Sequence, residues 1–166
     1  MDHEEARVST TSYTLVFRVF GDPKPQPRPR ATIRGRHAGM YDPGTADAWK
    51  LIVKNAATLR WNRRVFTGPV CVQIHWFMPR PKSHYTSKGA LKPNAPRWHK
   101  CKPDTDNLEK AVLDALTDLG LWRDDSQVCN VWKTKMYGEH PGACVIVTDA
   151  MPDFPWIVER ADRQEL

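Results

Sequence analysis

Two aspartates and a lysine stand at spacings suited to chemistry in residues 102–110 (KPDTDNLEK). Asp104 and Asp106 are two residues apart in the extended entry to a predicted helix, a spacing that can turn both side chains to one side of the backbone. Lys110 lies one helical turn after Asp106, so its ammonium group is expected near the same corner. The segment therefore predicts two neighbouring carboxylates with a cation beside them.

A second acidic pair follows the predicted helix, in residues 122–128 (WRDDSQV). The chain turns back there to Asp124 and Asp125, and we expect it to bring a third carboxylate to Asp104 and Asp106. Three carboxylates near one point repel one another, and a divalent cation that takes oxygen ligands relieves this repulsion. The pattern predicts a Mg²⁺ site, with Mn²⁺ as a second candidate. On a phosphodiester, such a site would activate a water molecule and stabilise the leaving oxygen, with a nearby lysine adding positive charge.

A structural interpretation of the same residues stays open. An Asp-x-Asp-Asn sequence before a helix is a common capping sequence, and Asp106 can cap the helix. Lys110 can equally form a surface ion pair with Asp106 or Asp114. The spacing alone does not choose between these roles and metal binding.

The positive charge of the chain is concentrated in two stretches. Residues 22–40 carry a net charge of +4, and residues 80–102 carry seven Lys or Arg and no acid, so the rest of a chain with a total of +6 sums to −5. Both stretches are rich in proline and glycine, which predicts loops rather than helix faces. Basic loops on an otherwise acidic chain favour a nucleic-acid partner over simple solubilisation.

Hydrophobic periodicity predicts the elements that position these residues. Strands are expected at 13–20, 70–78, 128–137 and 143–148, and helices at 45–60 and 106–119. In the first helix the expected apolar positions are Ala48, Leu51, Ile52, Ala56 and Leu59. The order strand, helix, strand, helix, strand, strand predicts an α+β fold, a single small domain with a mixed β-sheet of about four strands and two main helices.

Length and composition bound the remaining choices. A chain of 166 residues predicts one domain, here residues 13–150, with extensions at 1–12 and 151–166. The four cysteines have no C-x-x-C spacing, so we expect reduced, mostly buried thiols rather than a zinc site or disulfides. The absence of an apolar run of about 18 residues and an acidic N-terminus predict a cytoplasmic protein with no membrane partner. The sequence also lacks a P-loop, an H-E-x-x-H motif and a complete EF-hand loop.

Several short motifs resemble one known family. They are Gly21-Asp22-Pro23 with Arg28-Pro29-Arg30, Pro79-Arg80-Pro81-Lys82, the block Lys102 to Leu108 with Lys110 and Asp114-Ala115-Leu116, then Asp124-Asp125-Ser126-Gln127-Val128, and Lys135 with Tyr137. Over residues 17–147 the chain resembles the RusA-type Holliday junction resolvases, crossover junction endodeoxyribonucleases common in bacteria and their prophages. The central block is the specific part of the resemblance.

The resemblance implies a function and a set of roles. Asp104, Asp106 and Asp125 would be the metal-binding catalytic acids, with Asp124 as the neighbour most easily confused with Asp125, and Lys110 would be the catalytic lysine. It further implies a homodimer, Mg²⁺ dependence and paired symmetric incisions that resolve four-way DNA junctions in recombination and repair. Two nicks suit a two-fold dimer with one site per subunit.

Eight basic residues are the expected DNA contacts: Arg28, Arg30, Arg34, Arg36, Lys82, Lys88, Lys92 and Lys135. Trp98 and Tyr85 either stack on opened bases or pack within their loop. The alternative function is a DNA-binding or architectural module without catalysis, whose acids are caps and ion pairs. A requirement for divalent metal separates the two hypotheses.

Overall fold

The computed structural model describes residues 12–28, 30–34, 37–41 and 44–151. A four-stranded sheet has the strand order β1-β6-β4-β5 and is formed by β1 (Thr14–Phe20), β4 (Val70–Pro79), β5 (Val128–Gly138) and β6 (Gly142–Thr148). The pairs β1·β6 and β6·β4 are antiparallel, whereas β4 and β5 are parallel, as a helical crossover between them requires. The predicted α+β fold with a mixed sheet is confirmed.

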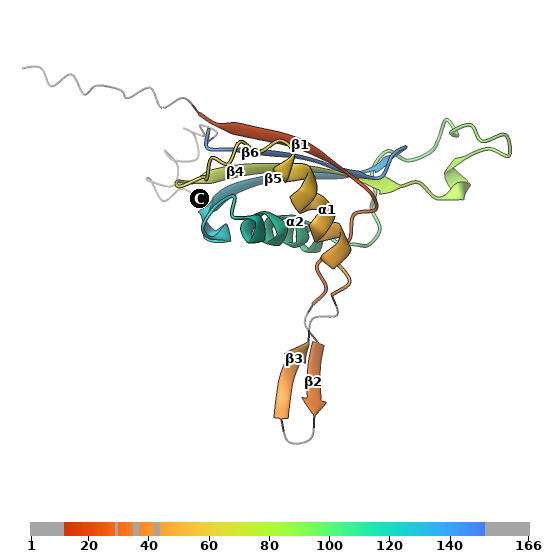
Figure 1. The fold of residues 1–166 in the computed structure, drawn as a ribbon. Helices are drawn as coiled ribbons and strands as arrows, with labels where there is room; N and C mark the ends of the chain where they lie inside the picture. The colour runs from red at the N-terminus through yellow and green to blue at the C-terminus, as the bar shows by residue number, and fades with distance from the viewer. Residues whose placement is uncertain (1–11, 29, 35–36, 42–43, 152–166) are drawn as a thin grey trace, which may run out of the picture.

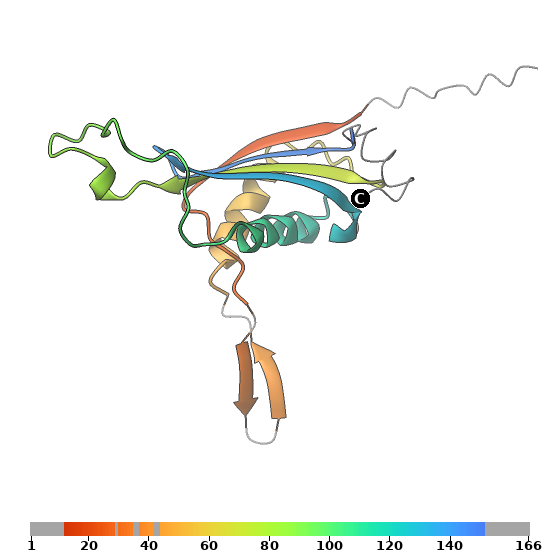
Figure 2. The same ribbon diagram turned by 180° about the vertical axis from the view of Figure 1, so that it is seen from behind.

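Two helices lie on one face of this sheet, and no described helix lies on the other face (Figures 1 and 2). They are α1 (Asp47–Thr58) and α2 (Thr105–Leu119). Short 3-10 turns, η1 (Lys82–His84) and η2 (Asp125–Gln127), follow β4 and precede β5. Among the described residues, no helix is long and apolar enough to cross a membrane.

The core lies between the helices and the sheet. Strand β4 alternates as predicted, and its inward side chains Val70, Val72, Ile74, Trp76 and Met78 are buried. Helix α2 buries one stripe against them, formed by Leu108, Ala111, Val112, Ala115 and Leu116. The stripe agrees with the periodicity of the sequence, and Gly120 ends the helix with φ of +81°, a conformation that favours glycine.

The predicted apolar face of the first helix is wrong. The helix buries Trp49, Val53 and Ala57, whereas Leu51 and Leu59 are exposed. The apolar residues of α1 fall on two neighbouring faces of the helix, one with Trp49 and Val53 and the other with Leu51 and Leu59. The large Trp49 side chain lies in the core, so its face is the buried one. The cap also differs, because Ala46 rather than Thr45 precedes the first helical residue.

Two further expectations need correction. The first basic stretch is not only a loop, since β2 (Arg30–Arg34) and β3 (His37–Tyr41) pair as an antiparallel hairpin that projects from the body of the protein (Figure 1). The four cysteines are free as expected, but only Cys71 is buried, whereas Cys101 and Cys129 are exposed. The predicted boundaries of the two extensions stay predictions, because residues 1–11 and 152–166 lie outside the described residues.

We expect Leu116→Ala to lower the free energy of unfolding by about 2–5 kcal/mol, because it removes a fully buried side chain and leaves a cavity under α2. Urea denaturation followed by circular dichroism measures this loss. Leu59→Ala is the matched control: this leucine is 85% exposed, and its replacement should change stability by no more than about 0.5 kcal/mol. Equal effects of the two substitutions would contradict the assignment of the core.

Candidate active site

The first two aspartates lie at the N-terminus of α2. Asp104 is the residue before the helix, with extended backbone, and Asp106 is in the first turn. The cap position is occupied by Asp104, so the interpretation of Asp106 as the cap is wrong. The Asp104 side chain makes no capping hydrogen bond either. Both side chains are exposed, and neither carboxylate accepts a hydrogen bond or ion pair from a described residue. The positive end of the helix dipole favours negative charge at this place.

A cleft of about 650 Å³ opens beside Asp104. One wall is the start of α2, and the other is the segment that follows β1. The amide of Gln26 donates to the carbonyl of Asn107 over 2.8 Å and so fastens that segment to the helix. Arg28 and Lys102 also line the cleft, which places two cationic side chains next to an uncommitted carboxylate.

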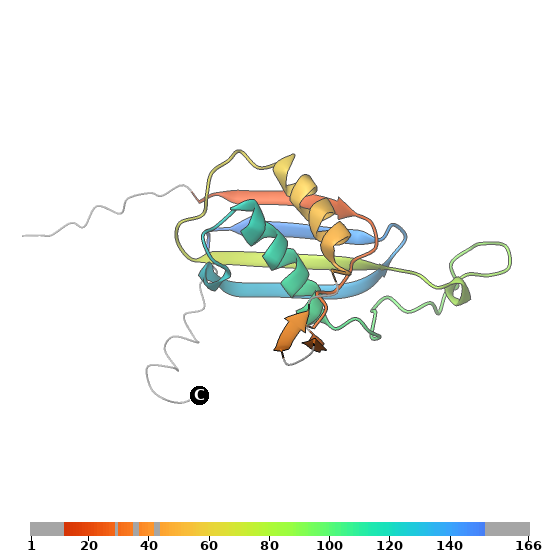
Figure 3. The same cartoon turned by 60° about the horizontal axis from the view of Figure 1, so that its bottom comes forward.

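Asp125 belongs to η2, which follows the C-terminal end of α2, whereas Asp104 precedes its N-terminal end. Figure 3 shows both helices from the side of the sheet that they cover. A helix of 15 residues is about 22 Å long at 1.5 Å per residue. Within the described part of the chain, no three His, Cys, Asp or Glu side chains are close enough to hold one metal ion. The expected return of a third carboxylate to Asp104 and Asp106 therefore does not occur in a single described chain, and the three-acid ligand set stays a prediction.

The structure separates Asp124 from Asp125. The Asp124 carboxylate accepts a hydrogen bond of 2.9 Å from the amide of Ser126, and Gln127 completes a capping box around it. Hydrogen bonds from Ser126, through its side chain and its amide, hold the pKa of Asp124 below its usual range. The Asp125 carboxylate accepts no hydrogen bond or ion pair from a described residue, although its backbone carbonyl accepts from the amide of Val128. Asp124 is thus occupied in shaping the turn, and Asp125 is available for a ligand.

The family resemblance favoured Asp125 over Asp124 as a ligand, whereas spacing alone did not separate the two, although the sequence contains a signal for their division. An acid followed three residues later by Gln127 is a capping-box spacing. Gln127 also donates to the carbonyls of Phe66 and Gly68, over 3.1 Å and 3.0 Å, so the turn is tied to the start of β4.

Lys110 is paired with Asp114 rather than with Asp106. Its ammonium group lies 3.1 Å from one Asp114 oxygen, and Lys50 of α1 lies 3.2 Å from the other. Of the two partners that the sequence left open, the structure selects Asp114. The Lys110 side chain is 60% exposed, so this surface ion pair contributes little to stability. If Lys110 turns toward Asp104 and Asp106, Asp114 is still paired with Lys50.

The second basic stretch forms an arm that projects from the end of β4 (Figure 2). Its order comes from local contacts: Tyr85 and Leu91 form an isolated bridge, and Arg80 donates to the carbonyl of Pro96 over 3.0 Å. The expected DNA contacts Lys82, Lys88 and Lys92 are exposed on it. Trp98 is 56% exposed, and the Arg97 guanidinium lies over its ring at 5.3 Å.

The other expected DNA contacts have different surroundings. Arg28 is exposed in the cleft. Arg30 and Arg34 belong to β2, but their side chains are outside the described part of the structure, and Arg36 lies outside the described residues. Lys135 of β5 donates to two carbonyls of the segment that leads to Asp104. The DNA-binding role of all eight residues stays a prediction.

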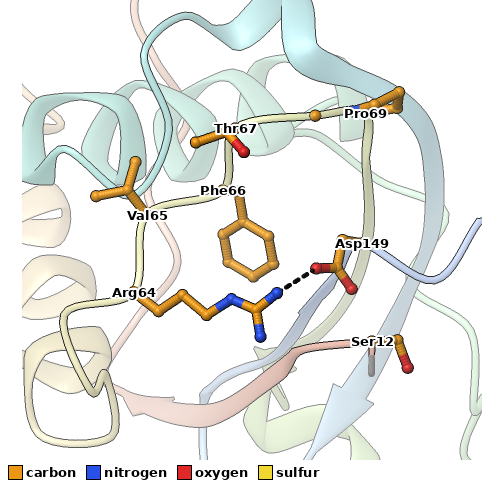
Figure 4. Close-up of a pocket in the computed structure, with 8 residues that line it drawn as sticks. Ser12, Arg64, Val65, Phe66, Thr67, Pro69 and Asp149 are labelled. Carbon is orange, nitrogen blue, oxygen red and sulfur yellow. Dashed lines mark hydrogen bonds and ion pairs between the residues drawn. The ribbon is translucent and has the colours of Figure 1, made fainter. Parts of the chain in front are cut away.

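A second cavity of about 310 Å³ lies where β4 begins (Figure 4). Its charged groups neutralise each other, since Arg64 lies 3.3 Å from Asp149 and stacks on the Tyr13 ring. Asp149 also accepts a hydrogen bond from the amide of Tyr13 over 2.6 Å. We assign this cavity a structural role, because its acid, Asp149, and its base, Arg64, are paired with each other.

Comparison with known proteins places this geometry in context. Residues 21–148, which include both helices and three of the four main strands, match the family model described as endodeoxyribonuclease RusA. The uncharacterized protein YqaN of Bacillus subtilis (strain 168) is 36% identical over 143 residues, which cover 81% of this chain and 96% of that protein. The crossover junction endodeoxyribonuclease RusA of Escherichia coli is 49% identical over 37 residues, which cover 22% of this chain and 31% of that protein.

We expect Asp124→Ala to lower the urea midpoint at neutral pH, because it removes the acceptor that closes η2. The lowered pKa of Asp124 means that its charged form stabilises the fold above the ordinary value of 3.8. This contribution is lost as the pH falls through the lower folded value, so the difference from the wild type should shrink in acid. Asp125→Ala is the matched control, and a loss of stability as large as that of Asp124→Ala would contradict the division of roles.

Proposed function

The chain belongs to the RusA endodeoxyribonuclease family, and we propose on this premise that it resolves four-way DNA junctions by metal-dependent phosphodiester hydrolysis in recombination and repair. One observation supports the proposal most directly. Asp104 and Asp106 are exposed and without described protein partners, and Asp104 lines a cleft that also holds Arg28 and Lys102. Acids with purely structural roles, such as Asp114 and Asp124, have partners in this protein.

The paired acids fit Mg²⁺, or Mn²⁺ in its place. Mg²⁺ binds through one or two protein carboxylates and keeps water or phosphate oxygens in its other positions. Asp104, which lines the open cleft, and Asp106 in the first turn of α2 offer that number of carboxylates. When bound, the ion would polarise a phosphate oxygen and lower the pKa of a water ligand.

The remaining groups supply binding and charge. Arg28 and Lys102 would bind the phosphates that flank the scissile bond, because they line the same cleft. Lys110 would stabilise negative charge that develops in the transition state after its ammonium leaves Asp114, which Lys50 continues to neutralise. The basic arm and the β2–β3 hairpin would contact the DNA arms through phosphates.

A homodimer would complete the site. Because Asp104 and Asp125 lie before and after α2 and do not gather with Asp106 within the described residues of one chain, Asp125 would reach an acid pair only on a second copy of the chain. A two-fold axis across α2 and β5 would bring opposite ends of the two helices together and form two such sites. Two equivalent sites are what paired symmetric nicks require.

We expect Asp104→Asn to abolish cleavage of a synthetic four-way junction while junction binding stays within about twofold. The amide keeps the size of the side chain but is a poor ligand for Mg²⁺. Gel analysis of each labelled strand, with Mg²⁺ or with EDTA, gives cleavage, and titration in Ca²⁺ gives binding. Tight binding with no cutting by the wild type in any metal would instead support an architectural module.

We expect a mixture of Asp104→Asn and Asp125→Asn proteins to regain nicking after subunit exchange, although each variant alone is inactive. With sites shared between subunits, half of the dimers are mixed and each has one intact site, so activity should return to about a quarter of the wild type as single nicks. The matched control mixes Asp104→Asn with Asp106→Asn, which share one site and cannot complement. Equal inactivity of both mixtures would contradict the shared site.

A further inference from the structure

The segment 100–103 connects two fixed points beside the acid pair. Before it, residues 97–99 are fastened to the outer edge of β5, because the amide of Tyr137 donates to the carbonyl of Arg97 over 2.9 Å and the amide of His99 donates to the carbonyl of Lys135 over 3.2 Å. After it, α2 begins, packed on the sheet by its buried stripe. The backbone conformation of residues 100–103 therefore sets the position of Asp104.

The Lys135 side chain bonds to this path. Its ammonium group donates to the carbonyl of Cys101 over 2.7 Å and to the carbonyl of Pro103 over 2.5 Å. Lys135 is only partly exposed and belongs to a regular strand, paired with Trp76 of β4. Two of the three donors of an ammonium group are therefore used on carbonyls one and three residues before Asp104.

The imidazole of His99 lies near the Lys135 ammonium group. The His99 ring packs against the Tyr137 ring at 4.7 Å. Burial, and then the charge of Lys135, lower the pKa of His99, so this imidazole is neutral at pH 7. Burial raises the pKa of Tyr137, so its phenol is neutral as well.

Asp104 needs support from its backbone, because its carboxylate accepts no bond from a described residue and its side chain does not cap α2. We propose that Lys135 is a positioning residue for the metal ligand Asp104, acting through the carbonyls of Cys101 and Pro103 rather than by contact with DNA. The inference rests on the proposed metal-dependent function. Metal sites depend in this way on groups that orient their ligands.

The proposal differs from a phosphate-binding role in what it predicts. Lys82 and Lys88 are exposed on the basic arm, and no ion pair or hydrogen bond of their ammonium groups with a described residue competes with phosphate. For Lys135 to bind phosphate with all three donors, it would have to release both carbonyls. Its loss should therefore alter metal binding, whereas the loss of Lys82 or Lys88 should alter affinity for DNA.

The test uses the full chain with Lys135→Met, which keeps an unbranched stem but has no donor, and Lys135→Arg, which restores donors and charge. Lys133→Met is the matched control: Lys133 projects from the same side of β5 and pairs with Glu109 of α2. Binding of Mn²⁺ without DNA is measured by calorimetry, junction affinity is measured in Ca²⁺, and hydrogen exchange is followed in peptides that cover residues 100–107.

We expect Lys135→Met to weaken Mn²⁺ binding by about 10- to 100-fold. Exchange in residues 100–107 should become faster, and junction affinity should stay within about twofold. Lys135→Arg should recover part of the metal affinity, and Lys133→Met should leave it unchanged. If Lys135→Met does not fold, Lys135→Gln, which keeps one donating group without charge, is expected to show the same changes in smaller measure.

Three results would overturn the proposal. One is weaker junction binding with a reduced salt dependence and unchanged Mn²⁺ affinity, which identifies a phosphate contact. Another is an equal loss of Mn²⁺ affinity in Lys133→Met, which identifies a general effect of charge. The last is unchanged exchange and metal affinity in Lys135→Met. Failure of the proposed nuclease function is distinct, because a wild type that binds Mn²⁺ but cuts no junction still gives the metal-binding comparison.

Discussion

The packing of α2 on the sheet is the constraint on which the rest of the site depends. Its buried stripe from Leu108 to Leu116 is in contact with the inward side chains of β4, so the helix can neither rotate nor slide without opening the core. Fixing the axis of a helix fixes both of its ends. Asp104 and Asp106 are thereby held at the N-terminal end, and η2 with Asp125 is held beyond the C-terminal end.

The fixed position of α2 separates the carboxylates at its two ends. Helix α2 keeps Asp125 apart from Asp104 and Asp106, so within the described residues these three carboxylates do not gather, which avoids the repulsion that such a cluster would cause without a metal. The remaining pair, Asp104 and Asp106, lies where the helix dipole favours anions. Under the proposed dimer, a complete ligand set exists only when two chains associate, so hydrolytic activity would be confined to the species that can make two nicks.

Local patterns allowed the sequence to predict the elements that dominate this arrangement. Alternation in β4 and the single apolar stripe of α2 each point to one buried face, and the structure agrees. Where two faces compete, as in α1, periodicity cannot choose, because the decision depends on how Trp49 fits the sheet. The distance from Asp104 to Asp125 was also missed, since the predicted turn after α2 was expected to reverse the chain toward the acids, whereas the helix keeps its two ends apart.

The roles of the lysines depend on contacts even farther apart in the sequence. In the sequence, Lys135 looks like the other basic residues, yet its carbonyl partners are 32 and 34 positions away. The ammonium group of Lys135, carried by β5, donates to both of these carbonyls. The basic residues thus divide by their partners. The ammonium groups of Lys50 and Lys135 bind groups of the protein itself, whereas those of Lys82 and Lys88 are exposed on the arm and available to bind phosphate. A positive total charge conceals this division, and only the partners of each ammonium group reveal it.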